Sequence, residues 1–209
     1  MCDETADPLR SIEFGLVTIP LQGESVSGDD YIIKPFHNGV LVAVVDGLGH
    51  GYEAARASGI AIAALDTYVH ESIIPLVKHC HDALKGTRGV VMSIAKFNLP
   101  DNTLSWLGVG NIECVLLRAD EKFAPSHERL LLRGGVLGYQ LPTLRESIIP
   151  VMRGDTLVFA TDGIRSGFEE GLKAGERPQQ IADNIMTGFS RGTDDALVLV
   201  VRVVRYICK

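Results

Sequence analysis

The sequence has few cysteines, and their spacing excludes the common structural uses of this residue. Its four cysteines, Cys2, Cys80, Cys114 and Cys208, are widely scattered and include no Cys-x-x-Cys pair. Neither a zinc site nor a disulfide framework is therefore indicated. We expect all four to be reduced thiols, as in a cytosolic protein.

Long hydrophobic runs and clusters of basic residues are also missing. The longest apolar run, residues 39–45, is far too short to cross a bilayer, and the first residues form neither a basic nor an apolar segment. The net charge is -6 and no Lys/Arg run is present, whereas nucleic-acid binding needs clustered cations. The sequence thus predicts a cytoplasmic protein that binds neither nucleic acid nor a membrane.

No tract rich in Gly and Ser or in Pro divides the chain. With 46% hydrophobic and 22% charged residues, the composition is that of an ordered globular protein. A length of 209 residues favours one domain. We therefore predict a single domain over residues 1–209.

Hydrophobic periodicity predicts a protein dominated by β-strands, with three helices. Residues 38 and 39, Asn-Gly, should supply the positive-φ residues of a tight hairpin. Mainly antiparallel strands with few helices favour an α+β fold of two packed sheets flanked by helices. We predict strands over 12–19, 31–36, 39–45, 89–97, 103–109, 112–118, 129–133, 144–149, 156–160 and 196–204, and helices over 52–68, 73–84 and 178–189.

Acidic residues recur at the ends of the predicted strands. An apolar strand leads into Asp46-Gly47, and a second leads into Asp162-Gly163. Two Asp-Asp pairs, residues 29–30 and 194–195, stand directly before strands. One Asp-Gly alone is usually only a turn. Four sites in this context indicate carboxylates that rigid strands aim at one point, and each pair leaves open which aspartate contributes.

Converging carboxylates beside glycines suit a hard divalent cation, because such ions prefer oxygen ligands and glycine lets backbone carbonyls approach closely. Two such ions can polarise a phosphoryl group and lower the pKa of a water molecule until it attacks as hydroxide. The predicted chemistry is therefore hydrolysis of a phosphomonoester.

The order of these motifs is similar to that of a known family. Ser-Gly-Asp29, Asp46-Gly-x-Gly-His-Gly, Ala-Thr-Asp162-Gly and Thr-Asp194-Asp-Ala resemble the PPM (type 2C) metal-dependent phosphatases, in particular their SpoIIE-like branch, over nearly the whole chain. The resemblance implies an α-β-β-α sandwich and a centre for two Mn²⁺ or Mg²⁺ ions. Asp46 would bridge the ions, the Gly47 carbonyl would bind one of them, and Asp162 and Asp194 would bind the other. Asp29 would complete the site.

The resemblance extends to the substrate. The short length and the Gly-Val-Gly-Asn-Ile-Glu stretch at 108–113 are most similar to stressosome feedback phosphatases. The implied partners are STAS-domain stressosome proteins that carry phosphoserine or phosphothreonine. Family members outside this branch hold phosphate with an arginine before the first acidic motif, but residues 16–29 contain neither Arg nor Lys. Phosphate recognition must therefore depend on the metal ions or on another residue.

His50 has two interpretations. An imidazole titrates near neutrality, so His50 is a candidate catalytic acid for the departing serine or threonine oxygen. Alternatively, it only caps or packs against the helix that follows.

Three other functions compete with a protein phosphatase. A binding module of the same fold would have lost a ligand, but all four acidic motifs are present. A small-molecule phosphoesterase would need a positively lined pocket, and the sequence has no Lys/Arg run to form one. A calcium-binding protein would more typically show an EF-hand loop, whereas these aspartates are dispersed along the chain.

Overall fold

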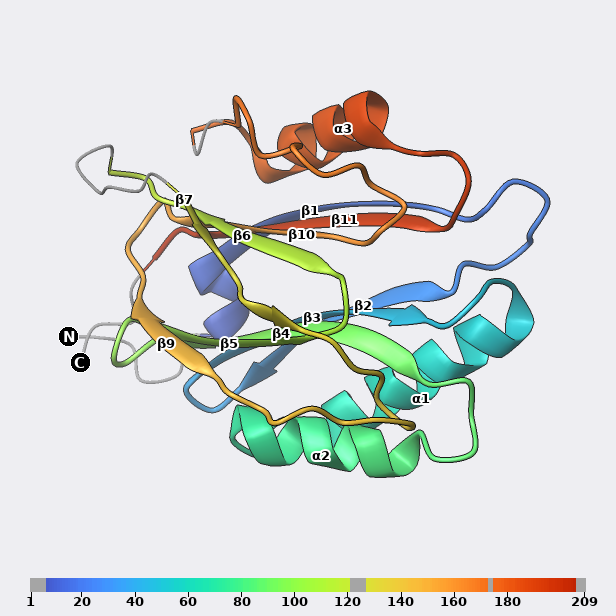
Figure 1. Cartoon of the computed structure of the whole chain (residues 1–209). Coiled ribbons are helices and arrows are strands. Elements are labelled where there is room, and N and C mark those ends of the chain that lie inside the picture. Colours follow the sequence, from blue (N-terminus) through green and yellow to red (C-terminus); the bar gives the residue numbers. More distant parts are fainter. Residues whose placement is uncertain (1–6, 121–126, 173–174, 206–209) are drawn as a thin grey trace.

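Two β-sheets pack face to face, and helices cover both outer faces (Figure 1). The computed structural model describes residues 7–120, 127–172 and 175–205. The first sheet contains β1 (Ile12–Ile19), β11 (Ala196–Val203), β10 (Thr156–Ala160), β6 (Glu113–Leu117) and β7 (His127–Arg129), in this order. The second contains β2 (Asp29–Phe36), β3 (Gly39–Gly47), β4 (Val90–Asn98), β5 (Thr103–Val109) and β8 (Leu132–Arg133), and β9 (Ser147–Pro150) pairs with β5.

The helices lie outside the sandwich. A short 3-10 helix, η1 (Pro8–Ser11), precedes β1. Helices α1 (Tyr52–Thr67) and α2 (Ile73–Ala83) pack on the second sheet, and α3 (Pro178–Phe189) packs on the first (Figure 1). All strand pairs are antiparallel except that of β5 with β8. The predicted α+β fold, two packed and mainly antiparallel sheets flanked by helices, is confirmed.

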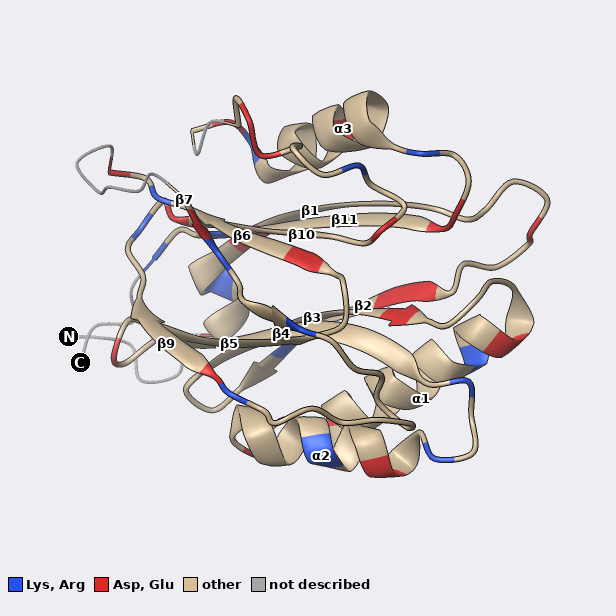
Figure 2. Cartoon of the chain, viewed as in Figure 1, with Lys and Arg blue, Asp and Glu red and all other residues tan. Residues whose placement is uncertain are grey.

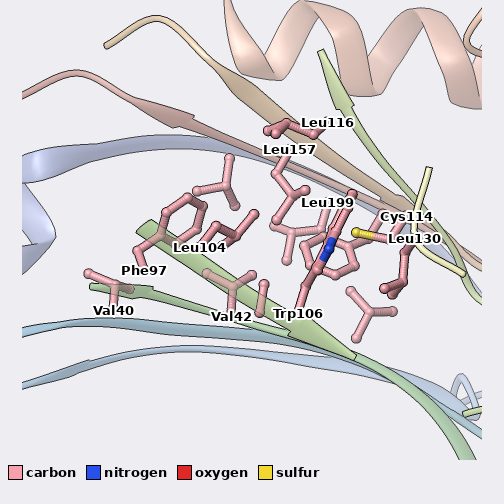
Figure 3. Close-up of a cluster of buried hydrophobic side chains, with 14 of the residues drawn as sticks. Val40, Val42, Phe97, Leu104, Trp106, Cys114, Leu116, Leu130, Leu157 and Leu199 are labelled. Carbon is pink, nitrogen blue, oxygen red and sulfur yellow. The ribbon is translucent and has the colours of Figure 1, made fainter. Parts of the chain in front are cut away.

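Strand alternation separates the core into three layers. Side chains such as Val42, Trp106 and Leu199 fill the space between the sheets (Figure 3). The opposite faces of the strands pack under the helices, with Ala61 and Leu76 over the second sheet and Ile181 over the first. Because both faces of the central strands are buried, β3 and β11 consist almost entirely of apolar residues.

Two details of the predicted strands are wrong. Residues 129–133 do not form one strand, because the chain crosses there from β7 in the first sheet to β8 in the second. The last predicted strand before β10 is β9 (Ser147–Pro150), which begins later than expected. The chain thus passes from β7, at the edge of the first sheet, to β8, at the edge of the second.

The hairpin between β2 and β3 forms, but not for the predicted reason. Phe36 pairs with Gly39 across a two-residue loop, and neither Asn38 nor Gly39 has a positive φ. A Cβ atom at Gly39 would lie 1.8 Å from the carbonyl oxygen of Phe97 on β4. Glycine is therefore needed at this position for close packing of the strands and not for a left-handed backbone.

Two further observations concern the predictions about membrane spans and cysteines. Among the described residues, no helix is long and apolar enough to span a membrane. Cys80 and Cys114 are buried free thiols, whereas Cys2 and Cys208 lie outside the described residues.

Candidate metal centre

Asp29 and Asp46 face each other at the end of the β2–β3 pair, where they are direct Cα partners. Asp46 lies on the same face of β3 as Val44 and Val42, which belong to the core between the sheets. Asp30 lies on the other face of β2, which it shares with Ile32 and which packs against α1. Strand alternation thus directs Asp29 and Asp46, but not Asp30, into the space between the sheets.

The first sheet contributes the other predicted carboxylates. Asp162 follows β10 and Asp194 precedes β11, at the end of the sheet that faces Asp29 and Asp46. A hollow of about 230 Å³ is lined by Asp46, Asp162, Asp194, His50 and Asn111, among other residues. Residues far apart in the sequence therefore meet at one edge of the sandwich, as the strand-end pattern predicted.

Hydrogen bonds fix two of these carboxylates. The side-chain amide of Asn111 donates to Asp162 Oδ2 at 2.8 Å, and the Thr161 hydroxyl donates to Asp29 Oδ2 at 2.7 Å. Neither donor was predicted from the sequence. Asn111 belongs to the 108–113 stretch, which gave no indication of this contact, but Thr161 has a signal in the Ala-Thr-Asp-Gly motif, since it directly precedes a candidate ligand.

Burial and mutual repulsion disfavour ionisation of three carboxyls, those of Asp29, Asp46 and Asp194. Burial, and then the charges of Asp29 and Asp162 foremost, raise the pKa of Asp46 from 3.8 to about 8. Burial raises the pKa of Asp29 from 3.8 to about 7, although the Thr161 hydrogen bond opposes this. The pKa of Asp194 is also raised, chiefly by burial. A divalent cation would remove this repulsion and favour the ionised form of all three.

The two Asp-Asp pairs contain residues with different surroundings. Asp195 is buried and accepts hydrogen bonds from the backbone amides of Leu21, at 2.7 Å, and Gly28, at 2.8 Å. Its carboxylate therefore holds the β1–β2 connection in place, and Asp194 is the member of the pair that lines the hollow. Asp30 accepts from the amide of Tyr31 at 2.8 Å, on the face away from the centre. The two members of each pair thus have different surroundings, and the assignment of Asp29 and Asp194 as metal ligands stays a prediction.

The donor set suits Mg²⁺ or Mn²⁺, since its candidate ligands are carboxylate and carbonyl oxygens. Within the part of the chain that the structure describes, no three Asp, Glu, His or Cys side chains already form a group that could hold a metal ion. Asp46, Asp162 and Asp194 line a shared hollow, whereas Asp29 is not among its lining residues, and the carboxylates are not drawn together, as expected for like charges. A Cβ atom at Gly47 would lie 2.2 Å from the carbonyl oxygen of Ala54, so the backbone at the end of β3 lies against α1. The role of the Gly47 carbonyl as a ligand stays a prediction.

His50 lines the hollow, and Arg88 lies close to Gly49, another of its lining residues. The Nδ1 atom of His50 lies 2.6 Å from Glu24 Oε1, so its N–H donates to this carboxylate. A Cβ atom at Gly49, which lines the hollow, would be 2.7 Å from Arg88 Nη1. Neither Glu24 nor Arg88 was predicted from the sequence, because each belongs to a connection with no distinctive pattern.

The family model for Stage II sporulation protein E (SpoIIE) matches residues 37–204. The chain belongs to the SpoIIE family. Phosphoserine phosphatase RsbX of Bacillus subtilis (strain 168) is 26% identical over 176 residues, which cover 83% of this chain and 86% of that protein. The predicted resemblance to PPM phosphatases of the SpoIIE-like branch is confirmed, with RsbX among the similar proteins, and the prediction of a phosphatase is confirmed with it.

Solved structures agree with this membership of the SpoIIE family. A chain from the structure described as "The bacterial stressosome: a modular system that has been adapted to control secondary messenger signaling" has a TM-score of 0.82 and 29% identity, and the match covers 91% of this chain and 99% of that one. RsbX in complex with magnesium also has a TM-score of 0.82, with 22% identity over 92% of this chain and 95% of the other. The likeness to RsbX in complex with magnesium shows that the two chains share a fold.

Proposed function

We propose that this SpoIIE-family chain is a metal-dependent protein serine/threonine phosphatase of the stressosome. Its substrates would be STAS-domain proteins that carry phosphoserine or phosphothreonine. The observation that carries the proposal is the meeting of Asp46, Asp162 and Asp194, from both sheets, around one hollow. Burial, together with the charges of neighbouring carboxylates, raises the pKa of Asp46 and of Asp194, which suits a centre that works with divalent cations.

Each residue of the centre has a proposed task. Asp29, Asp46, Asp162 and Asp194 would hold two Mn²⁺ or Mg²⁺ ions, with the Gly47 carbonyl. Such ions, when bound, polarise a phosphoryl group and generate hydroxide near neutral pH. Asn111 keeps the Asp162 carboxylate in one orientation through its hydrogen bond. His50, held by Glu24, would donate a proton to the serine or threonine oxygen as it departs.

Arg88 is a candidate for the phosphate-binding residue that the sequence leaves open. Its guanidinium lies close to Gly49, which lines the hollow, although Arg88 follows the acidic motif in sequence instead of preceding it. A guanidinium binds two phosphate oxygens with its planar fork. We assign Arg88 to hold the phosphoryl group while the carboxylates hold the metal ions.

Two comparisons support the stressosome substrate. RsbX, a relative over most of both chains, is named a phosphoserine phosphatase. The stressosome chain covers 91% of this chain at 29% identity. A STAS-domain phosphoprotein is therefore the first substrate to test.

The decisive experiment measures phosphate release from a phosphoserine STAS-domain protein and from p-nitrophenyl phosphate. Mn²⁺ should support release, a chelator should stop it, and Asp46→Asn should abolish it. Asp30→Asn, which alters a neighbouring aspartate on the other face of β2, is the matched control and should retain activity. Metal binding without release from either substrate would favour the binding-module alternative, and release only from small esters would favour a small-molecule phosphoesterase.

A further inference from the structure

Four arginines surround one hollow at the end of the sandwich opposite the metal centre. The hollow has a volume of about 700 Å³, and Arg10, Arg153, Arg202 and Arg205 line it together with Glu13. Basic segments are visible at this end of the molecule, where β1 begins and β11 ends (Figure 2). The protein has a net charge of -6, so this concentration of positive charge is a local feature and not a property of the whole surface.

Backbone hydrogen bonds bring the four arginines together from separate parts of the chain. The carbonyl of Ser11, next to Arg10, accepts from the amides of Val204 at 2.8 Å and Arg205 at 3.4 Å. The amide of Gly154, next to Arg153, donates to the carbonyl of Val203 at 2.7 Å. These contacts tie η1 and the turn before β10 to the end of β11. The sequence shows no basic run because the fold, and not the chain order, gathers these residues.

The turn that carries Arg153 is held firmly. The buried Asp155 carboxylate accepts from the amides of Met152, at 3.0 Å, and Ala119, at 2.9 Å. It also forms an ion pair with the buried Arg118 at 2.8 Å. Because Asp155 anchors this turn, the position of the arginine beside it is set by the core.

Three of the arginines have no acidic partner among the described residues. Arg10, Arg202 and Arg205 form no ion pair within 4.0 Å with another described residue. Arg202 is half-buried, and its guanidinium donates to the Thr156 hydroxyl at 3.0 Å and to the carbonyl of Glu176. Burial lowers the pKa of Arg202, and the nearby Glu13 charge opposes this only in part. The hollow thus carries more positive than negative charge.

We propose that this arginine hollow, lined by Arg10, Arg153, Arg202 and Arg205, is a binding site for a compact anion that bears two or more phosphate groups. Guanidinium forks match phosphate oxygens in pairs. The arginines surround a single hollow instead of following a groove, which fits a compact polyanion better than an extended acidic peptide. The eight residues of β11 separate this hollow from the metal centre, a distance of about 25 Å at the usual rise of a strand. The ligand therefore does not compete with the phosphorylated substrate.

Isothermal titration of the metal-free protein with inorganic tripolyphosphate tests this proposal. Without divalent cations the acidic centre repels the ligand, so the heat reports on the hollow. Arg10→Ala and Arg205→Ala should each weaken binding by about five- to tenfold, the usual scale of one charged hydrogen bond. Glu13→Gln should tighten binding, because it removes the negative charge of the hollow. Arg145→Ala, an equal charge change on an exposed residue outside the hollow, is the control and should leave the affinity unchanged.

Other outcomes would overturn the assignment. If the wild type does not bind tripolyphosphate, or if Arg145→Ala weakens binding as much as Arg205→Ala does, there is no specific site. A hexaglutamate peptide that bound more tightly than tripolyphosphate would indicate an acidic protein segment as the ligand. Thermal unfolding of each variant confirms that it remains folded.

Discussion

The Thr161 hydroxyl donates a hydrogen bond of 2.7 Å to Asp29 Oδ2 across the space between the two sheets. Thr161 directly follows β10 of the first sheet, whereas Asp29 begins β2 of the second. This bond lowers the pKa of Asp29, while burial and three neighbouring carboxylates raise it. The sheets are therefore joined at a point where negative charges repel one another, and this has consequences for stability.

The stability of the metal-free protein should fall as the pH rises from 5 to 8. The Asp29 and Asp46 carboxyls, whose ordinary pKa is 3.8, have pKa values of about 7 and about 8 in the folded protein. In this pH window the folded state binds more protons than the unfolded state, so deprotonation favours unfolding. Each pKa unit corresponds to about 1.4 kcal/mol, and the expected loss is several kcal/mol in urea unfolding.

Two controls assign this pH effect to the carboxylates. Asp46→Asn removes one of them and should flatten the slope by raising stability at pH 8. Millimolar Mg²⁺ should restore stability at pH 8 in the wild type and have little effect at pH 5. A metal-free stability that stays level or increases from pH 5 to pH 8 would show that these carboxyls ionise normally.

Asp194 and Asp195 should differ sharply when each is changed to alanine. Asp195→Ala leaves the half-buried amide of Leu21 and the buried amide of Gly28 without acceptors and should cost about 2–4 kcal/mol in the free energy of unfolding. Asp194→Ala should cost little stability and should weaken Mn²⁺ binding by at least about tenfold, because a charged ligand is lost. Calorimetry of Mn²⁺ binding and urea unfolding of both variants separate the two effects. If both variants lose the same metal affinity and have the same free energy of unfolding, Asp194 and Asp195 do not have different roles.

The sequence predicted the site better where a carboxylate ends a strand than where a loop supplies a partner. Asp46 and Asp162 each follow a continuous apolar run, and this pattern reveals both the strand and its end. Asp29 was expected before its strand but lies within β2, because aspartate is a poor strand former and propensity cannot reveal its pairing with Asp46. Glu24 and Asn111 act through contacts across the fold, for which no local pattern exists.

The fold was also predictable wherever the hydrophobic pattern of a segment defines a helix or a strand. The wrong predictions concern segments whose structure depends on packing against residues far along the chain. The helices have clear periodicity and the central strands are continuous apolar runs, and the structure reproduces their predicted ranges to within a few residues. The crossing of residues 129–133 from one sheet to the other depends on neighbours that sequence pattern does not specify. Gly39 was attributed to turn conformation, although its role comes from the carbonyl of a strand far along the chain.

Gly39→Ala should destabilise the protein by about 2–4 kcal/mol. The added methyl group would lie 1.8 Å from the Phe97 carbonyl oxygen, so β3 and β4 must move apart. Gly59→Ala is the matched control, because Gly59 is exposed within α1 and an added methyl group meets nothing within 4 Å. Helix propensity predicts that this second change stabilises the protein by about 0.5–1 kcal/mol. Urea unfolding of both variants should give shifts of opposite sign.

Arg88→Ala should raise the KM for phosphorylated substrates by about tenfold, with a smaller effect on kcat, because one charged contact to phosphate is lost. Lys85→Ala is the control, since Lys85 lies on the same connection but pairs with Asp82 at 2.7 Å. Steady-state kinetics with p-nitrophenyl phosphate give both constants. Equal KM values for Arg88→Ala and Lys85→Ala would exclude Arg88 from phosphate binding.

His50→Ala should slow hydrolysis of phosphoserine far more than hydrolysis of p-nitrophenyl phosphate. A serine oxygen needs a proton as it departs, whereas p-nitrophenolate is stable as an anion, so only the first reaction requires a general acid. We expect a loss of about 100-fold in kcat for the phosphoprotein, the usual scale of general acid catalysis, and less than about fivefold for the small ester. Glu24→Gln, which keeps a hydrogen-bond acceptor 2.6 Å from the ring but removes the charge, should show the same selectivity to a lesser degree. If His50 instead only packs against α1, both substrates will be affected equally and the free energy of unfolding will fall.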